Sequence, residues 1–538
     1  MKDTLLTWLW AWIWPLVWLA LSLVIVMKIM EVFYLRPKRI EKHFSRQGIK
    51  GPSYRFFIGN MKEMVTLIFE ASSKPMLPCN SHNILPRVLS FYHHWKKIFG
   101  STFVLWFGPV ARLTVADPDL IREIFVSRSE YFERYEAHPL VRQLEGEGLV
   151  SLRGQKWAHH RKVINPTFHM DNLKLLMPLI GKRMVEMVEN WSSKSSSGEF
   201  EIDVYDWFHS LTEDTISQTV FGRSYEDGKA VFQLQAQQML FAAEAFYKVL
   251  IPGYRYLPTK KNTISWRLEK EIRSKLVRLI FKRKDDHEDE EKTAGEDGRA
   301  KDLLGLMIDE SRKLRGSSNM IISVQDIMEE CKTFFFAGKQ TTSSLLTWAT
   351  VLLAMHQDWQ ENARHEVLSV CGPCDIPTRD HLSKLKTLGM VLYETLRLYP
   401  PAVATIRTAR ADVDLGGYQI PRGTELLIPI IAVHHDTTLW GPDAAEFNPA
   451  RFSEGVARAA KHPAAFIPFG LGARTCIGQN LALMEAKLTV AILLQRFWFR
   501  LAPSYVHEPT VLMLLYPRYG SPIIFRHLSS PRHDHAST

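Results

Sequence analysis

The pattern of apolar positions begins with one long stretch that carries no charge. From Thr4 to Met27 the chain has 24 residues without Asp, Glu, Lys or Arg. A helix of that length spans roughly 36 Å, which exceeds the hydrocarbon core of a membrane at about 30 Å. The stretch is longer than the apolar region of a signal peptide, and no small-residue cleavage site follows it. We therefore predict a permanent single-pass anchor over residues 1–28, with the span at about 5–27.

After the anchor the pattern changes to short strands and long helices. Gly48, Gly51 and Pro52 end any continuation of the anchor helix, so we predict a basic hinge over 29–52. Strand-like runs flank Gly108-Pro109 and Pro421-Arg422-Gly423, and each pair of runs predicts a hairpin. The runs are Thr102–Phe107 with Val110–Val115, and Tyr418–Ile420 with Thr424–Ile428. Elsewhere the period is helical, so we expect a mainly α protein with small β-sheets and one catalytic domain over 53–526.

Two segments lack an apolar pattern. The acidic run 285–302 contains two glycines, which predicts a solvated surface loop, and residues 527–538 are expected to be a disordered tail. The whole chain of 538 residues is 46% hydrophobic and 23% charged. These proportions predict a large packed core and exclude a disordered, collagen-like or multispanning protein.

The distribution of charge predicts which side of the membrane each end of the anchor faces. The net charge is 67 − 57 = +10, and residues 28–50 hold seven bases and two acids, hence 7 − 2 = +5. A basic flank stays in the cytosol, so the N-terminus is expected to be lumenal and the bulk of the protein cytosolic. The diffuse excess favours an acidic protein partner or an anionic membrane surface, and the absence of a basic stripe argues against nucleic acid. Five cysteines, an odd number, do not suit a disulfide framework.

The segment richest in chemistry runs from Phe469 to Gly478, with the sequence FGLGARTCIG. Its glycines let the backbone turn tightly and let a flat ligand approach closely. Apolar residues at helical spacing follow it, so Cys476 is predicted to lie where a helix begins. The N–H groups and dipole there favour a thiolate, which a soft metal ion requires. Arg474, two residues earlier, can pair with a carboxylate.

This segment resembles the haem-binding signature of the cytochrome P-450 family of haem-thiolate monooxygenases, Phe-x-x-Gly-x-Arg-x-Cys-x-Gly. The resemblance implies that Cys476 is the axial ligand of the iron of haem b. In the family this ligand pushes electron density that favours O–O cleavage. The remaining signature positions are implied to bind the cofactor; they are Phe469, Gly472, Arg474 and Gly478.

Further segments match the family pattern in the same order along the chain. Glu394 and Arg397 lie three residues apart in an Glu-x-x-Arg motif, and Arg451 lies in a later Pro-x-Arg-Phe segment. The resemblance implies a buried charge network of these three side chains that supports the haem loop. Trp157 and Arg161 share one helix face, and with Arg407 they match positions that bind haem propionates. An exposed surface arginine is the alternative for Arg161 and for Arg407.

A helical pattern over 324–356 contains the segment Ala-Gly-Lys-Gln-Thr-Thr at 337–342. Glycine inside a helix costs roughly 1 kcal/mol relative to alanine, so Gly338 requires a reason. The resemblance implies a groove in which dioxygen lies beside the hydroxyl of Thr341, which helps to deliver protons. The family usually has an acid before this threonine, and here it is Gln340. An amide can only orient water, so proton delivery must use Thr341 and water or the reaction differs from hydroxylation.

The amino-acid sequences of several segments are most similar to those of the plant non-A-type clan, and within it to those of brassinosteroid carbon-26 hydroxylases. These segments are residues 48–55, 157–168 and 336–342. The resemblance implies hydroxylation of a hydrophobic small molecule. The alternative substrates within the clan are other plant hormones or terpenoids, namely a gibberellin, a cytokinin or a triterpenoid. The stretches Tyr135–Val150 and Met239–Tyr256, expected to contact substrate, are apolar and aromatic, which suits a steroid among other molecules.

No flavin or nicotinamide fingerprint is present in the sequence, so NADPH is expected to act only through a separate NADPH-cytochrome P-450 reductase. We expect the protein in the endoplasmic reticulum membrane. Two alternatives of other classes stay open. One is a haem-thiolate isomerase or lyase, which Gln340 favours and Thr341 opposes. The other is a membrane-tethered steroid-binding protein without turnover.

Overall fold

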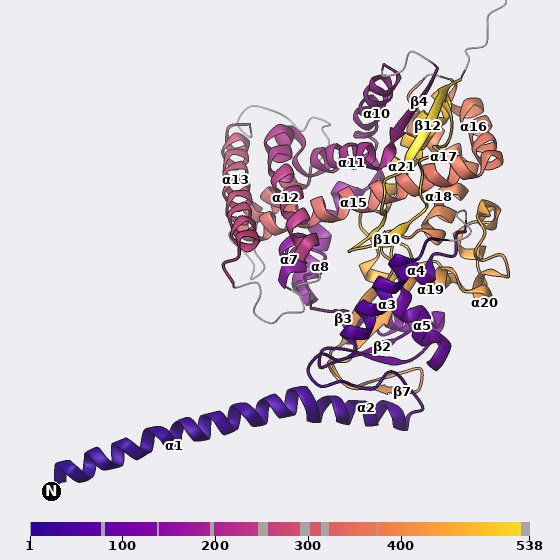
Figure 1. The fold of residues 1–538 in the computed structure, drawn as a ribbon. Coiled ribbons are helices and arrows are strands. Elements are labelled where there is room, and N and C mark those ends of the chain that lie inside the picture. The colour runs from indigo at the N-terminus through magenta and orange to yellow at the C-terminus, as the bar shows by residue number, and fades with distance from the viewer. Residues whose placement is uncertain are drawn as a thin grey trace, which may run out of the picture. The chain divides into compact units, whose positions relative to one another are not determined.

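The computed structural model describes residues 2–76, 81–136, 139–193, 198–245, 257–290, 302–313, 322–373 and 375–528. The chain forms two compact units, which we describe one at a time (Figure 1). The first unit contains Met1–Lys74, Leu85–Tyr135 and Ala404–Pro429, and the second contains Pro75–Ile84, Glu136–Val403 and Ile430–Thr538. The expectation of one catalytic domain over 53–526 stays a prediction.

The first unit begins with a continuous helical run. It consists of α1 (Lys2–Met30), a π-helical turn η1 (Glu31–Leu35) and α2 (Arg36–Arg46). The part from Trp14 to Arg46 is long and apolar enough to cross a membrane, and its most apolar stretch is not buried. The helix ends before Gly48, whose φ is 79°. The prediction of a hinge over 29–52 is therefore wrong up to Arg46, because Pro37 lies in the first turn of α2, where proline is tolerated.

The end of this helical run is fixed to the rest of the first unit by hydrogen bonds. The hydroxyl of Tyr54 donates to the carbonyl of Phe33 at 2.5 Å, and the Tyr54 N–H donates to Glu41 at 2.8 Å. The side chain of Gln47 both donates to the carbonyl of Gln419 (3.1 Å) and accepts from its N–H (2.7 Å). The anchor helix thus continues into a segment that is held at two places.

The first unit also holds a sheet with the strand order β1-β2-β8-β5-β3 and a small hairpin, β6-β7. The strands are β1 (Val104–Phe107), β2 (Val110–Thr114), β3 (Phe132–Arg134), β5 (Thr405–Ala409), β6 (Val413–Leu415), β7 (Tyr418–Ile420) and β8 (Glu425–Ile428). The other helical segments are α3 (Met61–Ser73), α4 (Leu85–Val88), α5 (Ser90–Phe99), α6 (Pro118–Arg122), η2 (Glu123–Ser127) and η3 (Ser129–Tyr131).

One of the two predicted hairpins forms. β1 pairs with β2 around Gly108 as expected. The second hairpin is wrong, because β7 pairs with β6 instead, across the turn at Gly416 and Gly417, which both have positive φ. β8 lies between β2 and β5. Its residues Leu426–Ile428 are all buried, which an inner strand of a covered sheet permits and a solvated hairpin does not.

The second unit is mainly helical, as predicted. Its longer helices are α7 (Pro139–Glu145), α8 (Gly154–Ile164), α10 (Met177–Ser192), α11 (Val204–Phe221), α12 (Tyr225–Ala245), α13 (Lys260–Glu290), α14 (Leu303–Lys313), α15 (Val324–Met355), α16 (Gln357–Cys371), α17 (Arg379–Lys384), α18 (Lys386–Leu398) and α21 (Gln479–Arg496). Its short helical segments are η4 (Asn165–Phe168), α9 (Met170–Leu173), η5 (Gly222–Ser224), α19 (Ile430–His434), α20 (Thr437–Trp440), η9 (Pro449–Phe452), η10 (Val456–Arg458), η11 (Pro463–Ala465) and η12 (Gly472–Arg474).

Helix α15 forms the centre of this unit and packs against α11, α18 and α21 (Figure 1). A capping box of Ser323 and Asp326 begins it, and most of its residues are buried on every side. α13 extends to Glu290, so the prediction of a loop from residue 285 is wrong over 285–290. The rest of the acidic run, residues 291–301, lies outside the described residues.

Two small sheets complete the second unit, with the orders β4-β12-β9 and β10-β11. The strands are β4 (Glu199–Asp203), β9 (Phe497–Leu501), β10 (Pro509–Val511), β11 (Leu515–Pro517) and β12 (Pro522–His527). His527 pairs with Phe497, and the Leu528 N–H donates to Arg496, so the predicted disordered tail is wrong for its first two residues. Residues 529–538 lie outside the described part of the chain.

Candidate functional site

The candidate site is built on the loop 469–478, which leads directly into α21. The Cys476 N–H donates to the Phe469 carbonyl at 2.8 Å and closes the loop on itself. Gly470 and Gly472 have φ values of 74° and 67°, which residues with a Cβ rarely adopt. The glycines of the motif are thus required by the turn that brings the sulfur to the start of a helix.

The surroundings of Cys476 act on its thiol in opposite directions. The net effect raises the pKa of the thiol, because burial outweighs the backbone N–H groups of Gly478 and Gln479 and the guanidinium of Arg161, which lower it. The side chain nevertheless remains accessible. A bound metal cation would displace the proton and would favour the thiolate strongly. The sulfur is therefore placed to act as a metal ligand rather than as an inert core thiol.

The residues present fit a haem at this sulfur. Among the described residues, no group of three or more His, Cys, Asp and Glu side chains could hold a metal ion together. An iron porphyrin brings its own ring nitrogen ligands and needs one thiolate from the protein, which Cys476 can supply. Gly478 carries no side chain, and a Cβ there would meet only the sulfur, at 3.9 Å, so the space beside the ligand atom is not filled by other protein atoms.

Two arginines and a tryptophan gather next to this loop. The guanidinium of Arg474 lies 4.4 Å from the ring centre of Trp157 on α8, and it donates to the Leu152 carbonyl at 2.9 Å. Arg161, one turn after Trp157, is partly buried, which lowers its pKa, whereas the nearby Cys476 raises it. The structure thus brings Trp157, Arg161 and Arg474 together at the cysteine loop, where cations can pair with carboxylates.

The motif predicted to handle dioxygen and protons lies in the middle of α15, which is helical throughout. The Thr341 hydroxyl donates to the Ala337 carbonyl at 2.5 Å. Gln340 and Thr341 are half-buried, and neither is hydrogen-bonded to the cysteine loop in the part of the chain that the structure describes. Gly338 has a packing reason, because a Cβ there would lie 2.6 Å from two side-chain carbons of Ile216 on α11.

The predicted structural network is assembled around one buried carboxylate. Arg397 donates two hydrogen bonds to Glu394, each of 2.7 Å, and both side chains are fully buried. Arg451 approaches the same carboxylate at 3.5 Å and is also paired with Asp443. The Asn448 N–H donates to Glu394 at 3.0 Å. The three predicted side chains are therefore in one place.

Arg407 lies in the first unit, on β5, and is described apart from these residues. Its guanidinium lies 4.5 Å from the ring centre of Phe125 and donates to the Ile406 carbonyl at 2.9 Å. Its role toward a haem propionate stays a prediction.

Sequence reasoning missed two ion pairs of α15, one half-buried and one fully buried. Lys339 pairs with Glu213 of α11, and Glu330 pairs with His160 of α8, whose Nδ1 lies 2.6 Å from Glu330. The partners are far apart along the chain, and each side chain alone is compatible with an exposed helix face. Only a contact between helices identifies them.

Comparison with known proteins decides the family. The family model described as Cytochrome P450 matches residues 76–519. The chain belongs to the cytochrome P450 family. It is 65% identical over 516 residues to Cytochrome P450 734A6 of Oryza sativa subsp. japonica, which covers 94% of each chain. It is also 65% identical over 511 residues to Cytochrome P450 734A1 of Arabidopsis thaliana, which covers 95% of this chain and 96% of that one.

A more distant relative is Cytochrome P450 CYP72A219 of Panax ginseng, 41% identical over 516 residues, with 95% of this chain and 98% of that one covered. The protein is thus a P450 monooxygenase, and its cofactor is a haem whose iron has a thiolate ligand. Proteins of this family generally receive electrons from an NADPH-dependent reductase and act on hydrophobic substrates. The N-terminal helix is consistent with the single membrane anchor of microsomal P450 proteins.

Proposed function

We propose that Cys476 is the thiolate ligand of the haem iron and that this P450 hydroxylates a brassinosteroid at carbon 26. The observation that carries the ligand assignment is the accessible sulfur of Cys476 at the start of α21, bordered by two backbone N–H groups and by Arg161. The steroid assignment rests on the resemblance of the sequence of residues 336–342 to that of brassinosteroid carbon-26 hydroxylases. It also rests on the high identity to the 734A relatives.

The residues around the sulfur have separate tasks in this proposal. The haem, when bound, supplies the activation of dioxygen for insertion of one oxygen atom into a C–H bond. The positive charges of Arg161 and Arg474, with the ring of Trp157, hold its carboxylate edge. The Glu394 network would fix the segment before the cysteine loop, because the buried Glu394 carboxylate joins Arg397 of α18 to Arg451 and to the Asn448 N–H of that segment.

Protons reach the site by way of water in this proposal. Thr341 directs its hydrogen to Ala337, so it presents its lone pairs as an acceptor. Gln340 has no acidic proton to transfer and orients water through hydrogen bonds of its amide. Thr341→Ala should therefore increase the amount of NADPH consumed per product formed. An unchanged ratio of NADPH to product would show that Thr341 has no role in proton delivery.

The remaining assignments concern the location and the partner. The positive flank of the anchor favours a lumenal N-terminus and a cytosolic catalytic part in the endoplasmic reticulum. The positive net charge favours docking of an acidic face of the reductase.

The ligand assignment is tested with the reduced, carbon monoxide-bound protein. The wild type should show the red-shifted Soret absorption of a thiolate-ligated haem, and Cys476→Ser should lose it. Persistence of that absorption in Cys476→Ser would exclude Cys476 as the ligand. Cys371→Ser, which changes a cysteine buried at the end of α16, is the matched control and should keep the absorption.

The substrate is tested in microsomes that contain the protein and its reductase. With NADPH and castasterone, mass spectrometry should detect a product heavier by one oxygen atom. A product that forms without NADPH would instead support an isomerase or lyase, which Gln340 favours. Binding without turnover would support a steroid-binding protein, and turnover of a gibberellin, cytokinin or triterpenoid alone would replace the steroid assignment.

A further inference from the structure

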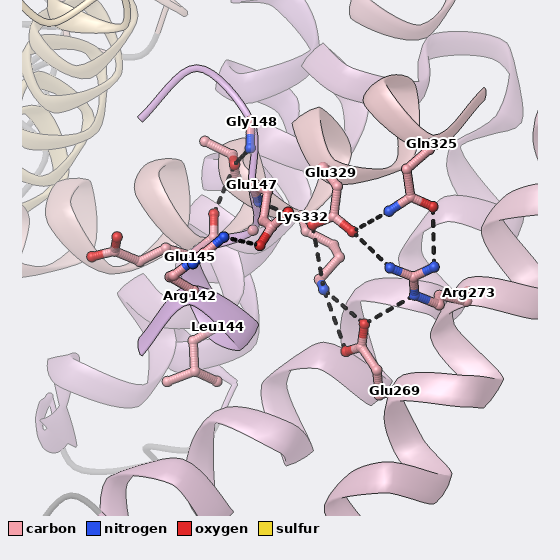
Figure 2. A network of polar contacts seen from close by, with 12 residues as sticks. Arg142, Leu144, Glu145, Glu147, Gly148, Glu269, Arg273, Gln325, Glu329 and Lys332 are labelled. Carbon is pink, nitrogen blue, oxygen red and sulfur yellow. Dashed lines mark hydrogen bonds and ion pairs between the residues drawn. The ribbon is translucent and has the colours of Figure 1, made fainter. Parts of the chain in front are cut away.

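The loop between α7 and α8 is held by side chains of the central helix α15. Three consecutive backbone N–H groups of this loop donate to that helix. The pairs are Glu147 with Glu329 at 2.9 Å, Gly148 with Thr333 at 3.2 Å, and Leu149 with Glu330 at 2.8 Å. Thr333 also donates to the Glu145 carbonyl at 2.7 Å. Figure 2 shows Glu147 and Gly148 beside these contacts.

The close approach of this loop explains one of its glycines. A Cβ on Gly148 would lie 2.5 Å from the Oε2 atom of Glu330 and 2.7 Å from the hydroxyl of Thr333. A side chain at this position would push the backbone away from α15. The loop is therefore adapted to the carboxylate that it binds.

Glu330 differs from Glu329 in what surrounds it. Glu329 lies among charged partners, with Arg273 at 3.2 Å and Lys332 at 3.7 Å (Figure 2). Glu330 is fully buried, and its second oxygen lies 2.6 Å from Nδ1 of His160, which is also buried. One carboxylate oxygen of Glu330 thus accepts a hydrogen bond from the loop, and the other is bonded to His160 of α8.

The two segments joined by Glu330 are the ones that lead to the haem edge. His160 lies on α8 between Trp157 and Arg161, and the loop continues to Leu152, whose carbonyl accepts from Arg474. Glu330 therefore contacts two segments, α8 and the 147–149 loop, each of which continues to a residue that contacts Arg474.

We propose that Glu330 is a positioning residue that ties the 147–149 loop to His160 and so holds Trp157 and Arg161 at the haem edge. The proposal rests on the proposed function, in which these two residues bind the haem. It assigns to the Glu330–His160 pair a role in haem retention that is separate from thiolate ligation.

The test is the rate at which the holoprotein transfers its haem to excess apomyoglobin, followed by the Soret absorption. Glu330→Ala loses both contacts and should transfer haem at least about tenfold faster, since breaking a buried pair is strongly unfavourable. His160→Phe fills similar space and breaks only the contact with α8, so it should also accelerate transfer. The double variant should be no faster than the faster single variant, because both act through one connection.

Conservative replacement separates this role from the charge of Glu330. Glu330→Gln keeps an acceptor for the Leu149 N–H and a group that can bond to His160, so its transfer rate should stay close to that of the wild type. If Glu330→Ala yields no holoprotein, His160→Phe and Glu330→Gln still decide the question. Unchanged haem transfer in His160→Phe, or equally fast transfer in Glu330→Gln and Glu330→Ala, would overturn the proposal.

Glu366 provides a matched control in another part of the second unit. Its carboxylate accepts the backbone N–H groups of Lys386, Thr387 and Leu388 at 2.7–3.0 Å, much as Glu330 accepts that of Leu149. Glu366→Ala should lower stability toward denaturant without accelerating haem transfer. If Glu330→Ala transfers haem no faster than Glu366→Ala, Glu330 has only a general structural role.

If Arg161 and Trp157 do not bind the haem, the haem transfer rates show a different pattern. Arg161→Ala and Trp157→Ala should accelerate haem transfer if these residues hold the haem. Unchanged transfer in both would remove the haem-edge assignment itself. Acceleration in both, with no effect of Glu330→Ala or His160→Phe, would reject only the proposal about Glu330.

Discussion

Replacing Arg397 by methionine should prevent most of the protein from accumulating with haem. The guanidinium is fully buried and donates to Glu394 through two bonds of 2.7 Å. It also donates to three backbone carbonyls and lies 5.0 Å from the ring centre of Trp440. Methionine can replace the packing of the side chain but none of these bonds.

The expected loss can be worked out from these contacts. Breaking a buried ion pair from one side costs about 3–5 kcal/mol, because the remaining charge stays buried without its partner. Each carbonyl left without a donor adds about 1–3 kcal/mol where water cannot replace the guanidinium. A domain is stable by only about 5–15 kcal/mol, so this single change approaches the whole free energy of unfolding.

The assay compares holoprotein yield from carbon monoxide difference spectra and the denaturant midpoint of the variants. Arg458→Met is the matched control, since this exposed arginine lies 3.8 Å from Glu454 and should contribute less than about 1 kcal/mol. The double variant Glu394→Gln/Arg397→Met should recover part of the stability, because no uncompensated charge remains at position 394. An Arg397→Met protein as stable as Arg458→Met, or a double variant worse than the single one, would refute this reasoning.

Two further predictions concern residues near the cysteine loop and the central helix. Burial raises the pKa of Glu485 to about 8, against about 4.3 in an unfolded chain, so the folded state retains the proton to higher pH. The stability of the wild type relative to Glu485→Gln should fall by up to about 1.4 kcal/mol per unit as pH rises from 5 to 8, and then level off. Denaturant unfolding at several pH values measures this difference, and a constant difference would contradict it. Gly338→Ala should destabilise the protein by about 1–3 kcal/mol because its Cβ meets Ile216. Ile216→Ala leaves a cavity of its own, so thermal unfolding should show a smaller added cost of Gly338→Ala in an Ile216→Ala background than in the wild type.

Local signals in the sequence located the anchor, the central helix and the cysteine loop. Each depends on residues that are neighbours along the chain: an uncharged run, apolar residues at helical spacing, or glycines next to a cysteine. The same kind of signal correctly ended the helix before Gly48, but the predicted hinge began too early, because Pro37 lies in the first turn of α2, where proline is tolerated. It also found the strand β8 but not its neighbours, since pairing depends on segments elsewhere in the chain.

The sequence alone determined that Cys476 follows a glycine-rich turn and precedes a helix, and the family resemblance supplied its proposed role as the haem ligand. The tertiary structure decided which side chains surround that cysteine and why Gly338 has no side chain. It also revealed that Glu330 joins His160, 170 residues away along the chain, to the 147–149 loop. The physical reason is that backbone conformation responds to near neighbours, whereas burial and the pairing of charges depend on which distant segments meet when the chain folds.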